Sequence, residues 1–132
     1  MKLKIFIGYD SREDIAYEVC RASILAHTDA EVYALRLDDL RERGLYWRAP
    51  DPFSSTEFSF SRFLVPALMN FKGRALFMDC DIFARSGLDR LWASLDPSKA
   101  VMCVKHPHYM PPDILKMDNQ MQTLYARKNW SS

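Results

Sequence analysis

Short apolar runs alternate with helical patterns along this chain. The first run, residues 3 to 7, is β-branched and aromatic and is followed by Gly8, Tyr9 and Asp10, so it predicts a short buried strand that ends in a turn. Residues 12 to 26 predict a helix, which Asp10 or its neighbour Ser11 would cap. The residues expected on the buried face of this helix are Ile15, Val19, Ala22 and Ala26.

The middle of the chain continues this alternation. Residues 31 to 37 predict a second strand and residues 38 to 43 a short helix that stops at Gly44. A loop rich in proline and serine follows, and then a helical pattern that runs from 60 to 71. Pro66 interrupts this pattern, so we expect a kink or a helix start there.

Two more strands are predicted in the second half of the chain. Residues 74 to 78 form the third and end at Asp79-Cys80-Asp81, and residues 100 to 104 form the fourth, with irregular backbone around Pro107. Between them, residues 86 to 89 have the form of a capping box at the start of a helix.

Strands that alternate with helices imply an α/β fold. We expect a single domain over residues 1–132, with a Rossmann-like, mostly parallel sheet covered by helices on both faces. Ligands of such sheets bind beyond the carboxyl ends of the strands, which selects Tyr9-Asp10 and Asp79-Cys80-Asp81. Residues 127 to 132 read as the approach to another strand, so the C-terminal part of the fold is expected to be missing.

Charge and cysteine content exclude several classes of function. The net charge of +1, from 18 basic and 17 acidic residues, provides no field for non-specific binding of nucleic acid. No apolar run approaches the length of a membrane span or a signal sequence, so a cytoplasmic protein is expected. Cys20, Cys80 and Cys103 are widely spaced among apolar neighbours, which favours buried thiols over disulfides.

The Asp-x-Asp sequence is the strongest chemical feature. Asp79 and Asp81 would point to one side of an extended backbone, with Cys80 on the other side. Carboxylate oxygens in this arrangement suit Mg²⁺ or Mn²⁺, which leave positions open for water and a substrate phosphate. In the alternative interpretation, one aspartate caps a turn and the other pairs with Arg85 or Arg74.

Three segments together resemble one family. Residues 5–10, 60–66 and 75–82, read as IFIGYD, FSRFLVP and ALFMDCDI, resemble the GT-A glycosyltransferases, most closely the glycogenin and lipopolysaccharide galactosyltransferase-like group. The most specific part is the ordered trio of a Tyr-Asp pair after the first strand, a helical arginine and a strand-terminal Asp-x-Asp. The resemblance spans nearly the whole chain.

The resemblance implies a donor site for a nucleotide-diphosphate sugar, with a UDP-sugar expected, and transfer of the glycosyl group with retention to an acceptor, possibly a saccharide. It assigns the metal, Mn²⁺ or Mg²⁺, to Asp79 and Asp81, and gives catalytic roles to Arg62 and Asp79. The residues that it implies at the donor nucleotide are Gly8, Tyr9, Asp10, Arg62, Asp79, Cys80, Lys128 and Asn129. The physics agrees in outline, since a tyrosine ring can stack on a base and a guanidinium can bind phosphate.

Structural alternatives stand beside these roles. Tyr9 could simply cover the end of the sheet, Asp10 could be a helix cap, and Arg62 could pair with Glu57. The chain also departs from the family, because it stops before the downstream histidine that supplies a third metal ligand. His106 and His108 lie too early for that role and are expected to be exposed loop residues.

Two other functions compete with a transferase. The first is a non-catalytic nucleotide- or metal-binding module that completes its sheet by forming a homodimer. The second is a phospho-receiver domain with Asp10, Asp79 and Lys105, although the adjacent acidic pair of such domains is missing here.

Overall fold

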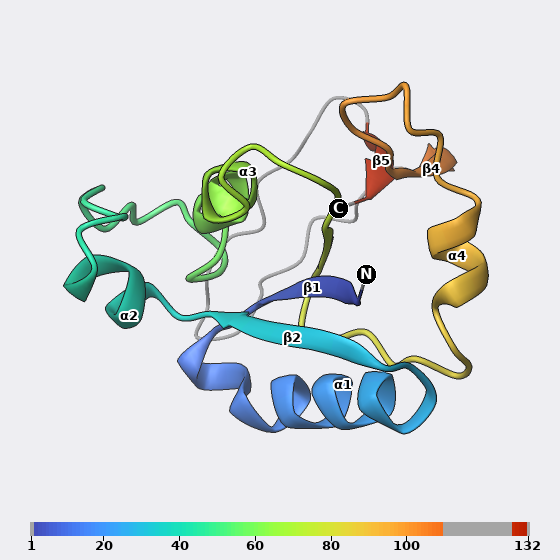
Figure 1. Cartoon of the computed structure of the whole chain (residues 1–132). Helices are drawn as coiled ribbons and strands as arrows, with labels where there is room; N and C mark the ends of the chain where they lie inside the picture. Colours follow the sequence, from blue (N-terminus) through green and yellow to red (C-terminus); the bar gives the residue numbers. More distant parts are fainter. Residues whose placement is uncertain (1, 110–127, 132) are drawn as a thin grey trace. The chain divides into compact units, whose positions relative to one another are not determined.

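The computed structural model describes residues 2–109 and 128–131 (Figure 1). The chain divides into two compact units. Residues 1–48 and 56–95 belong to the first, and residues 49–55 and 96–132 to the second. The functional residues predicted from the first three strands all belong to the first unit.

A parallel sheet organises the first unit. Its strands are β1 (Leu3–Gly8), β2 (Ala30–Leu35) and β3 (Leu76–Met78), in the order β2-β1-β3. Both neighbours run parallel to β1, and Ile7 is paired with Met78 in the register. The prediction of an α/β fold with a parallel sheet is therefore confirmed at this level, and the carboxyl ends of β1 and β3 lie next to each other.

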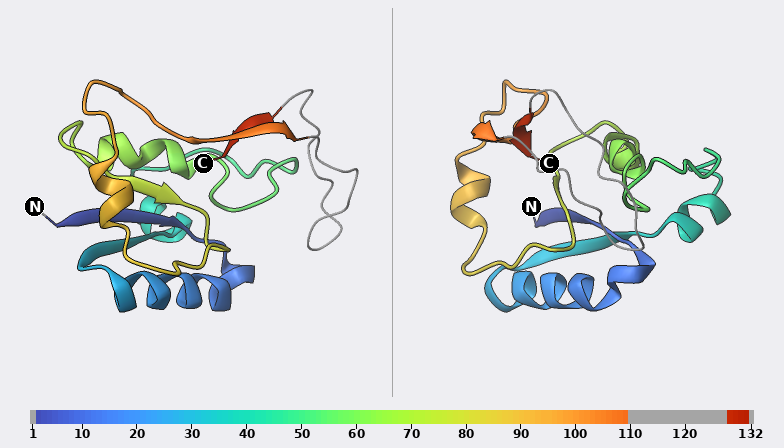
Figure 2. Two further views of the ribbon diagram at one scale, coloured as in Figure 1. Left: turned by 90° about the vertical axis from the view of Figure 1, so that its right-hand side faces the viewer. Right: turned by 180° about the vertical axis from the view of Figure 1, so that it is seen from behind.

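Helices connect these strands (Figures 1 and 2). The 14-residue α1 links β1 to β2 and runs along one face of the sheet. The other face is covered by residues from α2, the 3-10 helix η2 and α3, which pack around Phe6 of β1. The helices of this unit are η1 (Ser11–Glu13), α1 (Asp14–His27), α2 (Leu37–Glu42), η2 (Ser61–Leu64), α3 (Val65–Leu68) and α4 (Asp89–Ala93).

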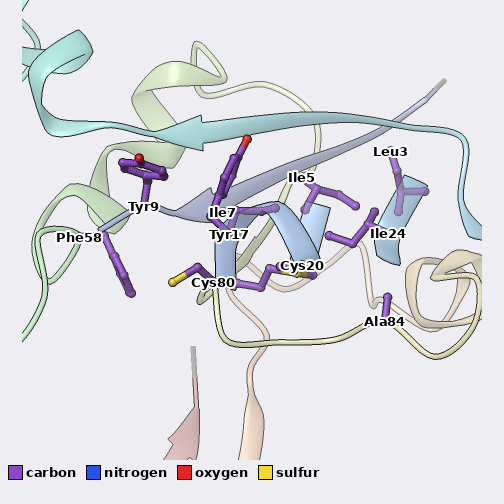
Figure 3. Close-up of a cluster of buried hydrophobic side chains, with 11 residues drawn as sticks. Leu3, Ile5, Ile7, Tyr9, Tyr17, Cys20, Ile24, Phe58, Cys80 and Ala84 are labelled. Carbon is purple, nitrogen blue, oxygen red and sulfur yellow. Dashed lines mark hydrogen bonds between the residues drawn. The ribbon is translucent and has the colours of Figure 1, made fainter. Parts of the chain in front are cut away.

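The larger core lies between the sheet and α1. Alternate residues of β1 point into it, because successive side chains of a strand face opposite sides, and they meet Tyr17, Cys20 and Ile24 of α1 (Figure 3). Phe58 and Cys80 complete this core beyond the end of β1. The site predicted from the sequence is thus built directly onto the main hydrophobic core.

The predicted buried face of α1 is wrong. Ile15 and Val19 are exposed, at 81% and 49% of their surface, and Ala22 and Ala26 are exposed too. The buried residues of the helix are Tyr17, Cys20, Ser23 and Ile24. Two apolar stripes share the helical spacing, and the hydrogen bond from the Tyr9 hydroxyl to Asp14 Oδ1, 2.6 Å long, fixes the second stripe against the sheet.

The structure confirms two predicted helix ends and contradicts a third. Pro66 stands in the first turn of α3, so the expected helix start is confirmed, and α2 ends before Gly44, which has a φ of +67°. The capping box is wrong, because α4 begins after Leu88 without a side-chain cap. The N–H of Leu88 is instead bound by Thr28 Oγ1 at 3.0 Å, a tertiary contact in place of the local one.

The second unit contains a two-stranded antiparallel ladder of β4 (Val104–Tyr109) and β5 (Lys128–Ser131). The predicted strand at 100–104 is therefore displaced, and His106 and His108 lie within a strand rather than in a loop. The register shifts between Lys105 and Tyr109, as expected around Pro107, which has no N–H for the ladder. Cys103 is exposed, which corrects its predicted burial.

Candidate donor site at the carboxyl edge of the sheet

Three segments that are far apart in the sequence meet at the carboxyl edge of the sheet. They are residues 8–11 at the end of β1, residues 57–62 before α3, and residues 79–81 after β3. Hydrogen bonds, an ion pair and ring contacts join the middle segment to both of the others. The structure therefore brings together the trio on which the family resemblance depends.

Asp10 is completely buried, and its carboxylate is fully engaged. Its Oδ1 accepts hydrogen bonds from the backbone N and the Nε of Arg12, at 3.0 and 2.9 Å. Its Oδ2 accepts from Arg12 Nη2 at 2.7 Å and from the backbone N of Glu57 at 3.1 Å. A carboxylate has about four acceptor positions, and all are used, so this geometry gives Asp10 a capping and bridging role.

Burial and these hydrogen bonds have opposite effects on the pKa of Asp10. Burial by itself would raise the pKa of the carboxyl group. The hydrogen bonds from Arg12 and from the backbone of Glu57, with the charge of Arg12, outweigh that effect and hold the pKa of Asp10 below its ordinary value. Asp10 is therefore an anion in the folded protein at neutral pH.

Glu57 returns the contact from the other side. Its Oε2 accepts a hydrogen bond from the backbone N of Ser11 at 3.1 Å, and its Oε1 accepts from Ser11 Oγ at 2.6 Å. Asp10 thus binds the backbone amide of Glu57, and Glu57 binds the backbone amide of Ser11, the residue after Asp10. We call these hydrogen bonds among Asp10, Ser11 and Glu57 the Asp10–Glu57 clamp.

Tyr9 is 8% exposed and points into the core. The guanidinium carbon of Arg36 lies 3.7 Å from the centre of its ring, and Tyr17 contacts the ring edge-on. The hydrogen bond to Asp14, together with burial, raises the pKa of the Tyr9 hydroxyl, although Arg36 acts in the opposite direction. Arg36 therefore occupies one face of the Tyr9 ring.

Gly8 has a steric reason to be glycine. A β-carbon at this position would lie 2.5 Å from the ring of Phe58, a distance that side chains do not tolerate. The ring of Phe58 is itself 2% exposed and belongs to the main core. The close approach of Phe58 to the backbone of β1 thus depends on the missing side chain.

Arg62 bridges the middle segment to β3. Its Nε donates a hydrogen bond to the carbonyl oxygen of Phe58 at 3.3 Å, and its guanidinium lies over the rings of Phe58 and Phe77, at 5.4 and 5.1 Å from their centres. Its Nη2 is 3.5 Å from Asp79 Oδ1. Arg62 therefore faces the first aspartate of the Asp-x-Asp sequence, and Glu57, the partner weighed in the structural alternative, binds Ser11 instead.

The two aspartates have different surroundings. The Asp79 side chain is 34% exposed, whereas Asp81 is largely exposed to solvent. Cys80 between them is buried, and its Sγ donates to Glu13 Oε2 at 3.4 Å. Because β3 ends at Met78 and residues 80 and 81 form a turn, the extended backbone assumed for this sequence is not present.

Asp79 and Asp81 are the residues that the resemblance assigns to a metal. Within residues 2–109 and 128–131, no group of three or more histidine, cysteine, aspartate or glutamate side chains is arranged to hold a metal ion. Asp79 and Asp81 would therefore supply two carboxylates at most from the described chain. Mg²⁺ sites of nucleotide enzymes commonly use one or two carboxylates, and water and substrate phosphates supply the other ligands.

The remaining predicted residues belong to the second unit. Lys128 and Asn129 are in β5, and Lys105 is in β4 of the same unit. A pocket of about 210 Å³ lies on the α2 and α3 face of the sheet, with Phe6, Leu35 and Leu40 among its lining residues, and none of the predicted site residues lines it. The described part of the chain has no helix long and apolar enough to cross a membrane.

The sequence did not predict the roles of Ser11, Arg12 and Arg36 at this edge. Phe58 is a core residue. The contacts of Ser11 with Glu57 span 46 positions of the chain, so no local sequence pattern predicts them. The one local feature that relates to this network is that Ser11 and Arg12 directly follow Asp10.

The chain is similar to a protein from Arabidopsis thaliana named Protein CDI. The two are 47% identical over 131 residues, which are 98% of this chain and 50% of that protein. The chain therefore spans about half the length of this curated relative. No family model matches the chain, and no solved structure matches it.

Proposed function

We propose that this chain is the donor-binding half of a metal-dependent glycosyltransferase of GT-A type. The donor would be a nucleotide-diphosphate sugar, with a UDP-sugar expected, and the glycosyl group would pass with retention to an acceptor such as a saccharide. The observation that carries this proposal is the meeting of Arg62 and Asp79 at the carboxyl end of β3, beside the end of β1. Ligands of parallel sheets bind at this edge.

The metal role belongs to Asp79 and Asp81 in this proposal. Mn²⁺ or Mg²⁺ held there would neutralise charge on the donor diphosphate when it is bound. Arg62 supplies a planar fork of N–H donors at the same place, suited to phosphate oxygens. Its present position, 3.5 Å from Asp79 Oδ1, keeps a positive charge beside the carboxylate in the structure described here.

The side chains of the chain would act by charge and position. As the bond to the diphosphate breaks, negative charge grows on the leaving oxygen, and a fixed guanidinium stabilises that charge more than it stabilises the ground state. The guanidinium of Arg62 lies over the rings of Phe58 and Phe77, which would limit its motion and its hydration on that side. The donor-binding role of Tyr9 requires Arg36 to move from the ring, whereas Asp10 serves the site through Glu57.

A second candidate is a non-catalytic nucleotide- or metal-binding module that forms a homodimer. The three-stranded sheet favours it, because β2 and β3 each have one edge without a partner strand in the described chain. Slow hydrolysis of a UDP-sugar without an acceptor would argue for the transferase. A phospho-receiver function is disfavoured by Asp10, whose acceptor positions are all occupied.

Calorimetric titration of UDP in the presence of Mn²⁺ tests the proposed function. We expect the wild type to bind, and Asp79→Ala and Asp81→Ala to weaken binding by about 10- to 100-fold while each keeps its fold. Asp29→Ala is the matched control, because Asp29 forms an exposed pair with Lys2 at the opposite end of the sheet. Binding by both site variants at wild-type strength would contradict the proposal.

A further inference from the structure

The segment that carries Arg62 has little regular structure of its own. Residues 56–60 form successive turns before η2 begins at Ser61. Arg62 lies at the start of η2, which packs with α3 on the sheet around Phe6, whereas the turns before it have few internal contacts to fix them. Two anchors hold these turns at the end of β1, the Asp10–Glu57 clamp and the ring of Phe58 against Gly8.

These anchors lead directly to Arg62. The clamp fixes residue 57, and the next residue, Phe58, accepts the hydrogen bond from Arg62 Nε with its carbonyl oxygen and lies under the guanidinium with its ring. The far side of the same guanidinium group meets Asp79. A displacement of residue 57 therefore moves both the acceptor and the ring on which Arg62 rests.

Glu57 is the member of the clamp that can be changed with the least damage. Asp10 is completely buried and also caps η1, so its removal disturbs the end of β1 directly. The Glu57 side chain is half-buried, and it accepts hydrogen bonds from the backbone N and the Oγ of Ser11. Its loss removes the two hydrogen bonds to Ser11, while the cap of η1 and the hydrogen bond from the Glu57 backbone N–H to Asp10 stay in place.

We propose that Glu57 is a positioning residue, which holds Arg62 opposite Asp79 through the Asp10–Glu57 clamp. The proposal rests on the proposed function in so far as Arg62 binds the donor. It adds a residue that contacts neither metal nor nucleotide but decides where the arginine is. Partners of this kind behind a ligand-binding side chain typically change affinity by about 10- to 100-fold when they are removed.

The first test needs no ligand. The Nε–H resonance of Arg62, assigned by its loss in Arg62→Lys, is followed in ¹⁵N–¹H spectra of the full chain. We expect Glu57→Ala to shift this resonance and to increase its exchange with solvent, and Ser11→Ala to do so more weakly. Glu31→Ala is the control, since Glu31 also accepts a hydroxyl hydrogen bond, from Tyr33, and pairs with Lys4 on β2.

The second test is a double-mutant cycle on the affinity for UDP with Mn²⁺. We expect Glu57→Ala to raise the Kd about tenfold in the wild type and by less than about twofold in Arg62→Ala, because the effect passes through Arg62. An equal factor in both backgrounds would overturn the positioning role. So would a change confined to the melting temperature, with affinity and the Arg62 resonance unaffected.

The two proposals fail in different ways. If the wild type does not bind UDP with Mn²⁺, the proposed function fails, and the spectra still decide whether Glu57 positions Arg62. If the wild type binds but Glu57→Ala leaves the Arg62 Nε–H resonance in place, the positioning role is overturned and the donor site stands.

Discussion

At the scale of single residues, Asp10 shows how burial and hydrogen bonding compete. The carboxylate has no contact with solvent, yet four donors surround it and Arg12 supplies the opposite charge. The pKa of Asp10 is therefore lower in the folded protein than in the unfolded chain. This difference makes a pH-dependent contribution to stability.

The sign of that contribution is fixed by the lowered pKa. The stabilisation is fully present above the unfolded value, about 3.9 for aspartate, and is lost as the pH falls through the lower pKa of the folded state. We expect Asp10→Asn to reduce the free energy of unfolding by about 2 to 3 kcal/mol at pH 7, since charged hydrogen bonds are lost. In urea denaturation the difference from wild type should shrink below about pH 4; a difference that stays constant to pH 2 would contradict this account.

The sequence predicted where some residues lie better than it predicted their partners. Asp10 and Asp79 were expected at the carboxyl ends of their strands, where the structure has them, and the helix-capping alternative for Asp10 is confirmed. Glu57 as the partner of Ser11 could not be predicted, because that contact depends on how a loop returns to β1. The occupation of the Tyr9 ring by Arg36 was equally hidden, since it requires the relative placement of β1 and β2.

At the scale of elements, α1 carries two apolar stripes and buries only one. The sequence predicted the helix itself but not its rotation, because both stripes recur at helical spacing. The choice is made by tertiary contacts of Tyr9 with Asp14 and Tyr17. Strand β3 was predicted from its apolar run, but the turn at Cys80 was not, because the Asp-x-Asp sequence was expected to continue the extended backbone.

This rotation of α1 can be measured with two isoleucines. Ile24 is fully buried and Ile15 is 81% exposed. We expect Ile24→Ala to lower the free energy of unfolding by about 3 kcal/mol and Ile15→Ala to change it by no more than about 0.5 kcal/mol. Urea denaturation followed by circular dichroism would show the difference, and similar losses for the two variants would mean that both stripes are covered.

At the scale of the whole molecule, the thiols report on the integrity of the first unit. Cys20 and Cys80 are 0% and 1% exposed in its core, whereas Cys103 in the second unit is exposed. Burial raises the pKa of Cys20 to about 11 and that of Cys80 to about 12, with the charge of Glu13 adding to the second shift. Both thiols are thus protonated as well as covered at neutral pH.

Reaction with a disulfide reagent at pH 8 should therefore divide the three cysteines. We expect one thiol, that of Cys103, to react under native conditions, and all three to react in denaturant. Cys103→Ser should abolish the native reaction, and this variant serves as the control. Rapid native labelling of three thiols would show that the core of the first unit opens readily.

The parallel pairing of β1 with both neighbours has a consequence for synthesis. On the ribosome, β1, α1 and β2 emerge first, whereas β3 follows about 40 residues after β2, roughly 2 to 8 seconds later at common translation speeds. Throughout that interval the nascent sheet shows an open edge along Ile5, Phe6 and Ile7, the positions that β3 will occupy. Until β3 occupies that edge, Asp79 cannot reach Arg62, so the pair between them can form only after the last strand of this sheet is in place.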